Sequence, residues 1–405
     1  MQSARSGHDE EAESLWREIL GTEPQHTQAL RNLGTHALQR GDNDEALKML
    51  EAARLTAPTD LFVLLMLADA RKTAGETDGE FEAIQWALAV DPLYVPALLK
   101  KGSWCERQGK SLSACEAYSR AMTHSGSEAQ WPGQLRAELG AARTYIERNS
   151  RGLHNFLAAE IRERLEELDS ESADRWREAA SIHAGRSGPY PSKSEQFHVP
   201  RLPAIPFFER SAFSRLEVLE RNVDRIHDEL AAVLERGQFQ PYVAYPPGEP
   251  VNQWQALNHS SRWSAFHLWR DGKPIAGNLD RLPETAKLLE EVELCDLDGF
   301  GPSAFFSALA PKTHIPPHHG ETNARVIAHL PLIVPDGCRL RVGFEERQWQ
   351  EGKTLVFDDT IEHEAFNDSN ALRVVMIFGL WNPLLSDADR HVASVLAEGR
   401  RNFAD

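Results

Sequence analysis

The sequence predicts an α+β, multidomain chain in which an all-helical repeat array precedes a domain of antiparallel β-strands. Prolines recur at an interval of 34 residues, at Pro24, Pro58 and Pro92, and glycines keep the same interval in that segment. A stretch rich in proline and glycine follows between residues 185 and 206, and short β-rich runs separated by turns lie beyond it. A length of 405 residues fits two or three domains of roughly 100–200 residues each.

The N-terminal third predicts three helix-pair repeats between residues 27 and 126. Small residues coincide when the repeats are aligned, and a glycine follows the first helix of each pair. This pattern resembles the tetratricopeptide repeat, in which small residues let paired helices approach closely. Glu80 and Lys101 depart from it. Residues 9–23 resemble a preceding half-repeat, and helical spacing of apolar residues continues to about Ile182, which predicts a cap on the array.

A repeat array of this kind predicts one of two roles, and the sequence leaves both open. The array presents a concave groove to a peptide or a partner protein, or it is a scaffold that orients or dimerises the domain behind it. The repeats contain no residues that predict catalysis.

The composition excludes several classes of function. Forty-four basic residues against 61 acidic ones give a formal charge of −17, which repels nucleic acid and anionic membrane surfaces. Cys105, Cys115, Cys295 and Cys338 lie far apart, which argues against a zinc knuckle or a disulfide framework and favours a reducing, cytoplasmic location. A polar N-terminus and the lack of any run of about 18 apolar residues argue against secretion and a membrane span.

The domain boundary is expected in the proline-rich segment. We predict a repeat domain over residues 1–184, a linker over 185–195 and a second domain over 196–405. One long amphipathic helix is expected over about 211–235, and β-rich runs follow it. They read AFFSAL, ARVIAHLPLIV, CRLRV, TLVFDD, HEAFN and RVVMIFGLW. Short strands without intervening helices favour an antiparallel sandwich or barrel.

Three of those runs carry the candidate chemistry. His318 follows two prolines at a turn, His363 begins a strand, and Arg373 lies ten residues further on in an otherwise apolar strand. Two neutral imidazoles can bind Fe(II) and leave positions open. A buried guanidinium needs an anionic partner, which a dicarboxylate cosubstrate would supply. On spacing alone, such a histidine pair is more often structural or at the surface than metal-binding, and Arg373 could pair with a protein carboxylate.

The segment from Phe197 to Pro383 resembles the catalytic domain of the aspartyl/asparaginyl β-hydroxylase family. The resemblance is carried by HVPRLPAIPFFE, by the WSAFHLWRDG block, and by H-x-G-x-T-N, F-D-D-x-x-x-H-E and a later arginine in combination. It implies a double-stranded β-helix, which is a jelly-roll, cupin-like fold. It also implies Fe(II) as cofactor, 2-oxoglutarate as cosubstrate and O₂ as oxidant, with tetratricopeptide-like helices as a frequent companion.

Carried over by position, the resemblance assigns roles to six residues. It makes His318 and His363 the iron ligands. It implies that Arg373 and Ser307 bind the distal carboxylate of 2-oxoglutarate. His329 would contact the cosubstrate near its chelating end. Trp263 would line the cosubstrate pocket, with a plain core tryptophan as the alternative.

The carboxylate that usually completes such an iron site is missing from this sequence. Gly320 stands two residues after His318, where iron oxygenases commonly carry an acid. The family resembled here is unusual in lacking that ligand, so the resemblance implies that water fills the position. His319 and Glu321 are expected to lie behind the ligands or at the surface.

Two departures concern the substrate. Ile327 stands where animal family members carry a second arginine, although Arg325 is kept, and Phe305 stands where they carry a basic residue. The paired cysteines of the secreted-pathway members are also absent. These changes weaken recognition of an aspartyl carboxylate and make the pocket more apolar.

The leading expectation is therefore hydroxylation at the β-carbon of an Asp or Asn residue in a peptide or protein, with the repeats as the element that would present it. The alternatives are hydroxylation of an acyl chain or a small amide, and a non-catalytic interaction protein based on the repeats. A cupin-like isomerase or sugar-binding barrel would use the same histidines without 2-oxoglutarate.

Overall fold

The computed structural model describes residues 9–404 except 132, 134, 214 and 271. The chain divides into two compact units, residues 1–186 and 187–405. Each unit has its own hydrophobic clusters, so each is described by itself. Within the described residues, no helix is long and apolar enough to cross a membrane.

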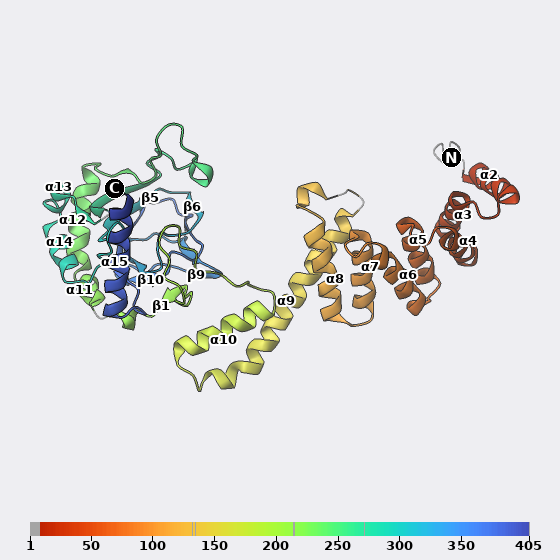
Figure 1. Cartoon of the computed structure of the whole chain (residues 1–405), viewed down its shortest axis with the longest axis horizontal. Helices are drawn as coiled ribbons and strands as arrows, with labels where there is room; N and C mark the ends of the chain where they lie inside the picture. Colours follow the sequence, from red (N-terminus) through yellow and green to blue (C-terminus); the bar gives the residue numbers. More distant parts are fainter. Residues whose placement is uncertain (1–8, 132, 134, 214, 271, 405) are drawn as a thin grey trace. The chain divides into compact units, whose positions relative to one another are not determined.

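The first unit is a run of antiparallel helices joined by short turns (Figure 1). Its helices, in chain order, are α2 (Asp9–Thr22), α3 (Thr27–Arg40), α4 (Asn43–Thr56), α5 (Leu61–Thr73), α6 (Thr77–Val90), α7 (Val95–Arg107), α8 (Ser111–His124), α9 (Arg136–Leu165) and α10 (Ser170–His183). Helices α3 with α4, α5 with α6 and α7 with α8 form the three tightest pairs. These pairs match the predicted repeats, and the unit is tetratricopeptide-like.

Small residues set the distance between the paired helices, as the sequence pattern predicts. A Cβ added to Gly34 would lie 2.6 Å from Leu50 Cγ, and one added to Gly102 would overlap the ring of Tyr118. Glycine also closes each first helix, because Gly41 has φ 79° and accepts the left-handed conformation at no steric cost. Glu80, which departs from the small-residue pattern, is buried in a two-oxygen contact with Arg107.

The start of the helical array has an open apolar face. Helix α2 packs on α3, and no described helix lies on its other side. Leu15 and Ile19 are therefore 44% and 36% exposed, and they line a cavity of about 540 Å³ with Trp16 and Ala29.

The second unit contains two antiparallel sheets. The major sheet has the order β1-β10-β7-β12-β5-β3-β2, with β4 paired to β3, and the minor sheet has the order β6-β11-β8-β9. The strands of the major sheet are β1 (Phe207–Phe208), β10 (Leu355–Phe357), β7 (Arg325–Ile333), β12 (Arg373–Trp381), β5 (Ala304–Leu309), β3 (Trp263–Arg270), β2 (Gln240–Pro241) and β4 (Lys273–Pro274). Those of the minor sheet are β6 (Thr313–His318), β11 (His363–Asn367), β8 (Cys338–Val342) and β9 (Glu345–Arg347).

The two faces of the major sheet differ in what covers them. Residues such as Phe306, Leu330 and Met376 pack against helices on the outer face. These helices are α11 (Leu216–Arg221), α12 (Val223–Glu235) and α14 (Pro283–Glu290). The inner face packs on the minor sheet, for example through Val375 and Leu340. Alternate residues of a strand therefore face either the helices or the space between the sheets.

The helix predicted over residues 211–235 is interrupted. It consists of a short 3₁₀ turn at Arg210–Ala212, then α11, then α12. The break lies at Asn222, whose side-chain amide donates to Val218 O at 2.8 Å and so competes with the helical ladder. Helices α13 (Ala276–Leu279) and α15 (Asp387–Ala404) complete the unit. The four cysteines are free.

Residues 192 to 195, which the sequence places in the linker, lie within the second unit and hydrogen-bond to its loops. Lys193 N donates to Thr360 O at 2.8 Å, and Glu195 N donates to Gly320 O at 3.0 Å. The chain therefore contacts the candidate site before its first strand begins.

Candidate active site

The two histidines singled out from the sequence are opposite each other on neighbouring strands. His318 ends β6 and His363 begins β11, and the two residues are cross-strand partners. Their ring centroids lie 4.0 Å apart with an angle of 50° between the ring planes. The structure thus brings together two imidazoles that are 45 positions apart in the chain.

Backbone carbonyls fix the tautomer of both rings. His318 Nδ1 is 2.8 Å from Pro316 O, and His363 Nδ1 is 3.0 Å from Ile361 O. A carbonyl oxygen only accepts, so each Nδ1 carries the hydrogen and each Nε2 keeps its lone pair. Burial lowers the pKa of His318 to about 4, and burial beside His318 holds the pKa of His363 well below its usual range. Both rings are neutral at physiological pH, the form that binds a metal.

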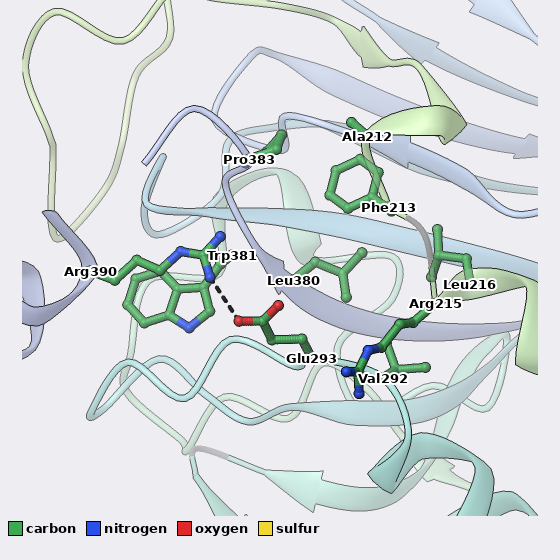
Figure 2. Close-up of a pocket in the computed structure, with 10 residues that line it drawn as sticks. All are labelled: Ala212, Phe213, Arg215, Leu216, Val292, Glu293, Leu380, Trp381, Pro383 and Arg390. Carbon is green, nitrogen blue, oxygen red and sulfur yellow. Dashed lines mark hydrogen bonds and ion pairs between the residues drawn. The ribbon is translucent and has the colours of Figure 1, made fainter. Parts of the chain in front are cut away.

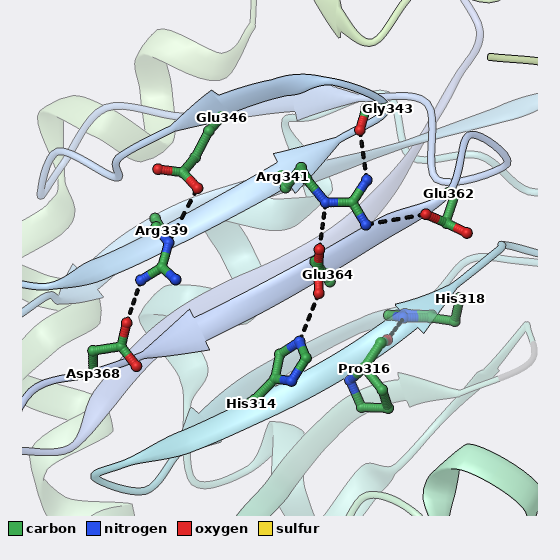
Figure 3. A network of polar contacts seen from close by, with 10 residues as sticks. All are labelled: His314, Pro316, His318, Arg339, Arg341, Gly343, Glu346, Glu362, Glu364 and Asp368. Atoms are coloured by element: carbon green, nitrogen blue, oxygen red, sulfur yellow. Dashed lines mark hydrogen bonds and ion pairs between the residues drawn. The ribbon is translucent and has the colours of Figure 1, made fainter. Parts of the chain in front are cut away.

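The outer face of the minor sheet carries a ladder of charges that supports these strands (Figure 3). Glu364 of β11 accepts from Arg341 of β8 and from His314 of β6, and Arg341 also donates to Glu362 at 3.0 Å. Figure 3 shows His318 at the end of β6, turned back onto Pro316 O. These ion pairs connect three strands on the outer face of the minor sheet, and the two histidines lie on its inner face.

The space beside Gly320 is filled by a carboxylate from another segment. A Cβ added to Gly320 would overlap the side chain of Asp359, and Gly320 N donates to Asp359 O at 2.6 Å. Burial raises the pKa of Asp359 to about 7, against the opposing effect of Arg325. Asp359 Oδ1 is buried and accepts no hydrogen bond from the described residues. A side chain at position 320 therefore has no room unless Asp359 moves.

Arg373 is a buried cation with little to neutralise it. Its side chain is among the largest fully buried ones, on the inner face of β12. Nη1 donates to Ser307 O at 3.4 Å, Nε has no hydrogen-bond partner in the described part of the chain, and the guanidinium carbon lies 4.9 Å from the Trp349 ring centre. Burial lowers the pKa of Arg373 to about 10, so the group stays charged at neutral pH.

Ser307 and Trp263 lie on the same inner face, from β5 and β3. Ser307 is opposite Val375 on β12 and Ala265 on β3. Trp263 Nε1 donates to Ser307 Oγ at 3.1 Å, which leaves the serine hydroxyl hydrogen free to donate elsewhere. Trp263 is therefore both a core tryptophan and the residue that orients Ser307.

His329 is held as a neutral donor. Trp349 Nε1 donates to His329 Nδ1 at 3.3 Å, so the hydrogen of the imidazole lies on Nε2. Burial, with Arg373 nearby, holds the pKa of His329 well below its usual range. Arg373, Ser307 and His329 thus supply hydrogen-bond donors on one face of three adjacent strands.

Comparison with known proteins agrees with this geometry. Residues 220–383 match the profile of the family described as Aspartyl/Asparaginyl beta-hydroxylase. "Aspartate beta-hydroxylase domain-containing protein 2" of Rattus norvegicus is 34% identical over 238 residues, which cover 56% of this chain and 67% of that protein. The chain belongs to the aspartyl/asparaginyl β-hydroxylase family. The human form of the same relative has the same identity, with 63% of its length covered, so the chain spans about two thirds of these relatives.

Two further similarities concern one sequence relative and one solved structure. "Ornithine lipid ester-linked acyl 2-hydroxylase" of Rhizobium tropici is 31% identical over 186 residues, covering 45% of this chain and 63% of that protein. Among solved structures, "Crystal structure of MamA" aligns at 20% identity over 37% of this chain and 95% of that one, with a TM-score of 0.30. The repeat assignment therefore rests on the helix geometry of this chain itself.

The arginine that this family member keeps, Arg325, is already engaged. Nη1 donates to Phe300 O at 2.5 Å, and Nη2 lies 3.2 Å from the Glu321 carboxylate and 3.7 Å from the Asp359 carboxylate. Glu321, which is predicted to lie behind the ligands or at the surface, is partly exposed and forms an ion pair with Arg325. His319, two residues before Glu321, is half-buried.

Four residues that the structure places at this candidate site were not predicted as site residues from the sequence. They are Asp359, Trp349, Tyr242 and Trp254. Asp359 lies inside the F-D-D-x-x-x-H-E motif, so the motif offered a signal for it. Trp349 and Tyr242 lie in loops and Trp254 ends a 3₁₀ turn, Asn252–Trp254, so none has a distinctive spacing, and only the folded chain brings them to the site.

Two further observations bound the site. Among the described residues, no group of three or more His, Cys, Asp or Glu side chains is arranged to hold a metal ion, so the histidine pair stands without a third such ligand. A cavity of about 110 Å³ lies elsewhere in the unit (Figure 2). It is lined by Phe213, Leu380, Trp381 and the Glu293–Arg390 ion pair, and by no residue that the sequence assigned to the site.

Proposed function

We propose that this chain is an Fe(II)- and 2-oxoglutarate-dependent hydroxylase that inserts oxygen into a C–H bond. The observation that carries the proposal is Arg373, a fully buried cation without a carboxylate partner in the described part of the chain. Burying an unpaired charge costs several kcal/mol, roughly, so the fold is expected to be completed by an anion. The neutral histidine pair lies in the same unit, between the same two sheets.

The residues present fit an iron ion. His318 and His363 each offer an Nε2 lone pair, and the backbone holds both rings in that tautomer. A pair of imidazoles that leaves other coordination positions open suits Fe(II). Structural zinc, in contrast, is enclosed by four protein ligands. Bound Fe(II) would supply the activation of O₂ that is coupled to the oxidative decarboxylation of 2-oxoglutarate.

The same face fits a dicarboxylate. Arg373 would hold the distal carboxylate by charge-assisted hydrogen bonds, and the Ser307 hydroxyl would donate a second contact. His329, with its hydrogen on Nε2, would donate to the end nearer the iron. Trp263 and Trp349 keep these donors in place, since each makes a hydrogen bond to one of them.

The two facing sheets support the double-stranded β-helix as the fold of residues 196–405. In this arrangement the site lies between the sheets, where the protein's own side chains exclude water from the reacting bond. The boundaries 1–184, 185–195 and 196–405 remain our domain proposal. A cytoplasmic location remains a prediction from the free cysteines.

Two substrate classes are proposed at this level. The family description and the domain-containing relatives favour an Asp or Asn residue of a peptide or protein, which the tetratricopeptide-like unit would present. The relative named as an acyl 2-hydroxylase favours an acyl chain. Phe305 and Ile327, both apolar and on the inner face, support the second class.

Succinate release tests the proposal. Purified chain with Fe(II), 2-oxoglutarate and O₂ is expected to convert 2-oxoglutarate to succinate, and the His318→Ala variant is expected to lose this activity. His319→Ala is the matched control, because His319 is the neighbouring imidazole outside the pair. Wild-type protein that leaves 2-oxoglutarate intact, or equal loss in both variants, would contradict the proposal.

A further inference from the structure

Helix α15, drawn in dark blue in Figure 1, has two apolar faces, and the second unit covers one of them. On the covered face, Ala393 and Ala397 belong to the same hydrophobic cluster as Trp381. The opposite face is exposed, and its apolar residues recur every three or four positions, as they do along one side of a helix. We call this set the α15 stripe, and its members are Ala388, Val392, Val395, Leu396, Gly399 and Phe403.

The α15 stripe leaves a large apolar area in water. Val392, Val395 and Leu396 are 57%, 54% and 57% exposed, and Phe403 is 94% exposed. With about 3.6 residues per turn and about 1.5 Å of rise per residue, the stripe covers roughly 100° of the helix circumference and extends for roughly 22 Å. None of its members is charged. A contiguous apolar surface of this kind marks a contact with another molecule.

The spacing of the α15 stripe is symmetric about its centre, which lies between Val395 and Leu396. A second, antiparallel copy of the helix, related by a two-fold axis through that point, would place each member of the stripe opposite another member. The facing pairs are Ala388 with Phe403, Val392 with Gly399, and Val395 with Leu396. Two of these pairs set a large side chain against a small residue, which lets two helices approach closely and still fill the space between them.

Gly399 fits this arrangement better than it fits an isolated helix. A glycine inside a helix is less favourable than an alanine, because it loses more backbone freedom on folding. A Cβ added to Gly399 would meet no atom of the described chain within 4 Å, so packing within one chain does not require a glycine there. Opposite Val392 of a second copy, the missing side chain would leave room for the valine.

The charges beside the α15 stripe are complementary in the same arrangement. A two-fold axis brings the same flank of both helices together. On one flank, Asp389 of each copy would lie beside Arg400 of the other, and on the opposite flank His391 would lie beside Glu398. Hydrogen bonds within the described chain use one carboxylate oxygen of Asp389 and one guanidinium nitrogen of Arg400, which leaves their other atoms for the second copy.

We propose that the α15 stripe binds a second copy of this chain, with the two α15 helices antiparallel about a two-fold axis. A membrane surface fits less well, because the flanks carry charges of both signs instead of the lysines and arginines of helices that bind anionic lipid. One helix pair is smaller than a standard protein interface, so the dissociation constant is expected to be on the order of micromolar. The proposal is independent of the hydroxylase function.

Analytical ultracentrifugation of the full chain tests the contact. From roughly 1 to 100 µM, on both sides of the expected dissociation constant, the wild-type chain is expected to pass from monomer to dimer. Leu396→Glu brings two glutamates together at the two-fold axis and is expected to weaken the dimer roughly 100-fold or more. Leu112→Glu in α8 is the matched control, because Leu112 is 73% exposed and outside the stripe, and it is expected to dimerise as the wild type does.

A charge exchange tests the antiparallel register. His391→Glu places a glutamate beside Glu398 of the other copy, twice in each dimer, and is expected to weaken the dimer roughly three- to tenfold. Adding Glu398→Lys to that variant turns both contacts into ion pairs and is expected to restore wild-type affinity. All of these positions are exposed, and circular dichroism shows that each variant is folded.

Three results would overturn the proposal. The first is a wild-type chain that stays monomeric over the whole range, or a folded Leu396→Glu variant that dimerises as tightly as the wild type. The second is a charge exchange that gives no rescue. The third is a monomer that sediments with vesicles of mixed zwitterionic and anionic phospholipid and loses this binding in Leu396→Glu, which would assign the stripe to a lipid surface. Succinate release tests the hydroxylase function separately.

Discussion

The two units of this chain bury different kinds of side chain. The helical unit buries alanine, leucine and a few glycines, and its charged groups mostly form ion pairs at the surface. The sheet unit buries Arg373, Arg325, His329, His363 and Asp359, several of them without full hydrogen bonding. Packing alone explains the first set. In the second set Arg325 and Asp359 pair with each other, whereas Arg373 has no carboxylate partner among the described residues, and the proposed cosubstrate would neutralise it.

The largest expected effect is the loss of the histidine pair. His363→Ala is expected to reduce succinate release to the background without protein, because one imidazole cannot hold the iron by itself. Loss of a buried side chain also costs stability, so activity is compared per folded molecule, as judged by circular dichroism. Retained activity in folded His363→Ala would show that the pair is structural.

Arg373→Met should separate function from stability. The affinity for 2-oxoglutarate, measured by calorimetry, is expected to fall roughly 10- to 100-fold, because a charge-assisted hydrogen bond contributes about 1.5–3 kcal/mol. The ligand-free protein is expected to become more stable by roughly 1–4 kcal/mol, because an unneutralised buried cation is replaced by an apolar side chain. A variant that is less stable without ligand would indicate that Arg373 is a structural residue.

Substitutions in the helical unit should change stability without changing activity per folded molecule. Gly102→Ala places a methyl group in the ring of Tyr118 and is expected to destabilise the unit by roughly 1–3 kcal/mol. Gly140→Ala in α9 is the matched control, since a Cβ there meets no atom within 4 Å, and it is expected to stabilise the helix by up to about 1 kcal/mol. Urea unfolding measures both, and succinate release per folded molecule should not change in either.

The smallest effect concerns a helix cap. Asp42 accepts from Glu45 N at 3.1 Å at the start of α4, and Asp42→Ala is expected to cost about 1 kcal/mol. A loss of activity beyond the loss of folded protein would mean that the helical unit affects the site and does not serve packing alone.

The sequence predicted the features that depend on spacing. Residues that recur every 34 positions must share an environment, so the helix pairs followed from Pro24, Pro58 and Pro92. His318, His363 and Arg373 also came from the pattern and from the family resemblance, and the structure places the two histidines face to face.

The features that depend on tertiary contact were not predictable in this way. Residue spacing cannot show that Asp359 fills the space beside Gly320, or that Arg325 is held by Glu321. The break at Asn222 depends on one side-chain hydrogen bond, which an apolar periodicity does not detect. Tyr242 reaches the site from a loop and Trp254 from a short 3₁₀ turn, where local sequence carries little signal.

Anaerobic titration with Fe(II) and 2-oxoglutarate tests the central claim most directly. We expect one iron per chain and a weak visible charge-transfer band that needs both Fe(II) and 2-oxoglutarate, is kept in His319→Ala and is lost in His318→Ala and in His363→Ala. A band that persists in both of the last two variants, or a wild-type chain that forms none, would contradict a two-histidine iron site in this protein.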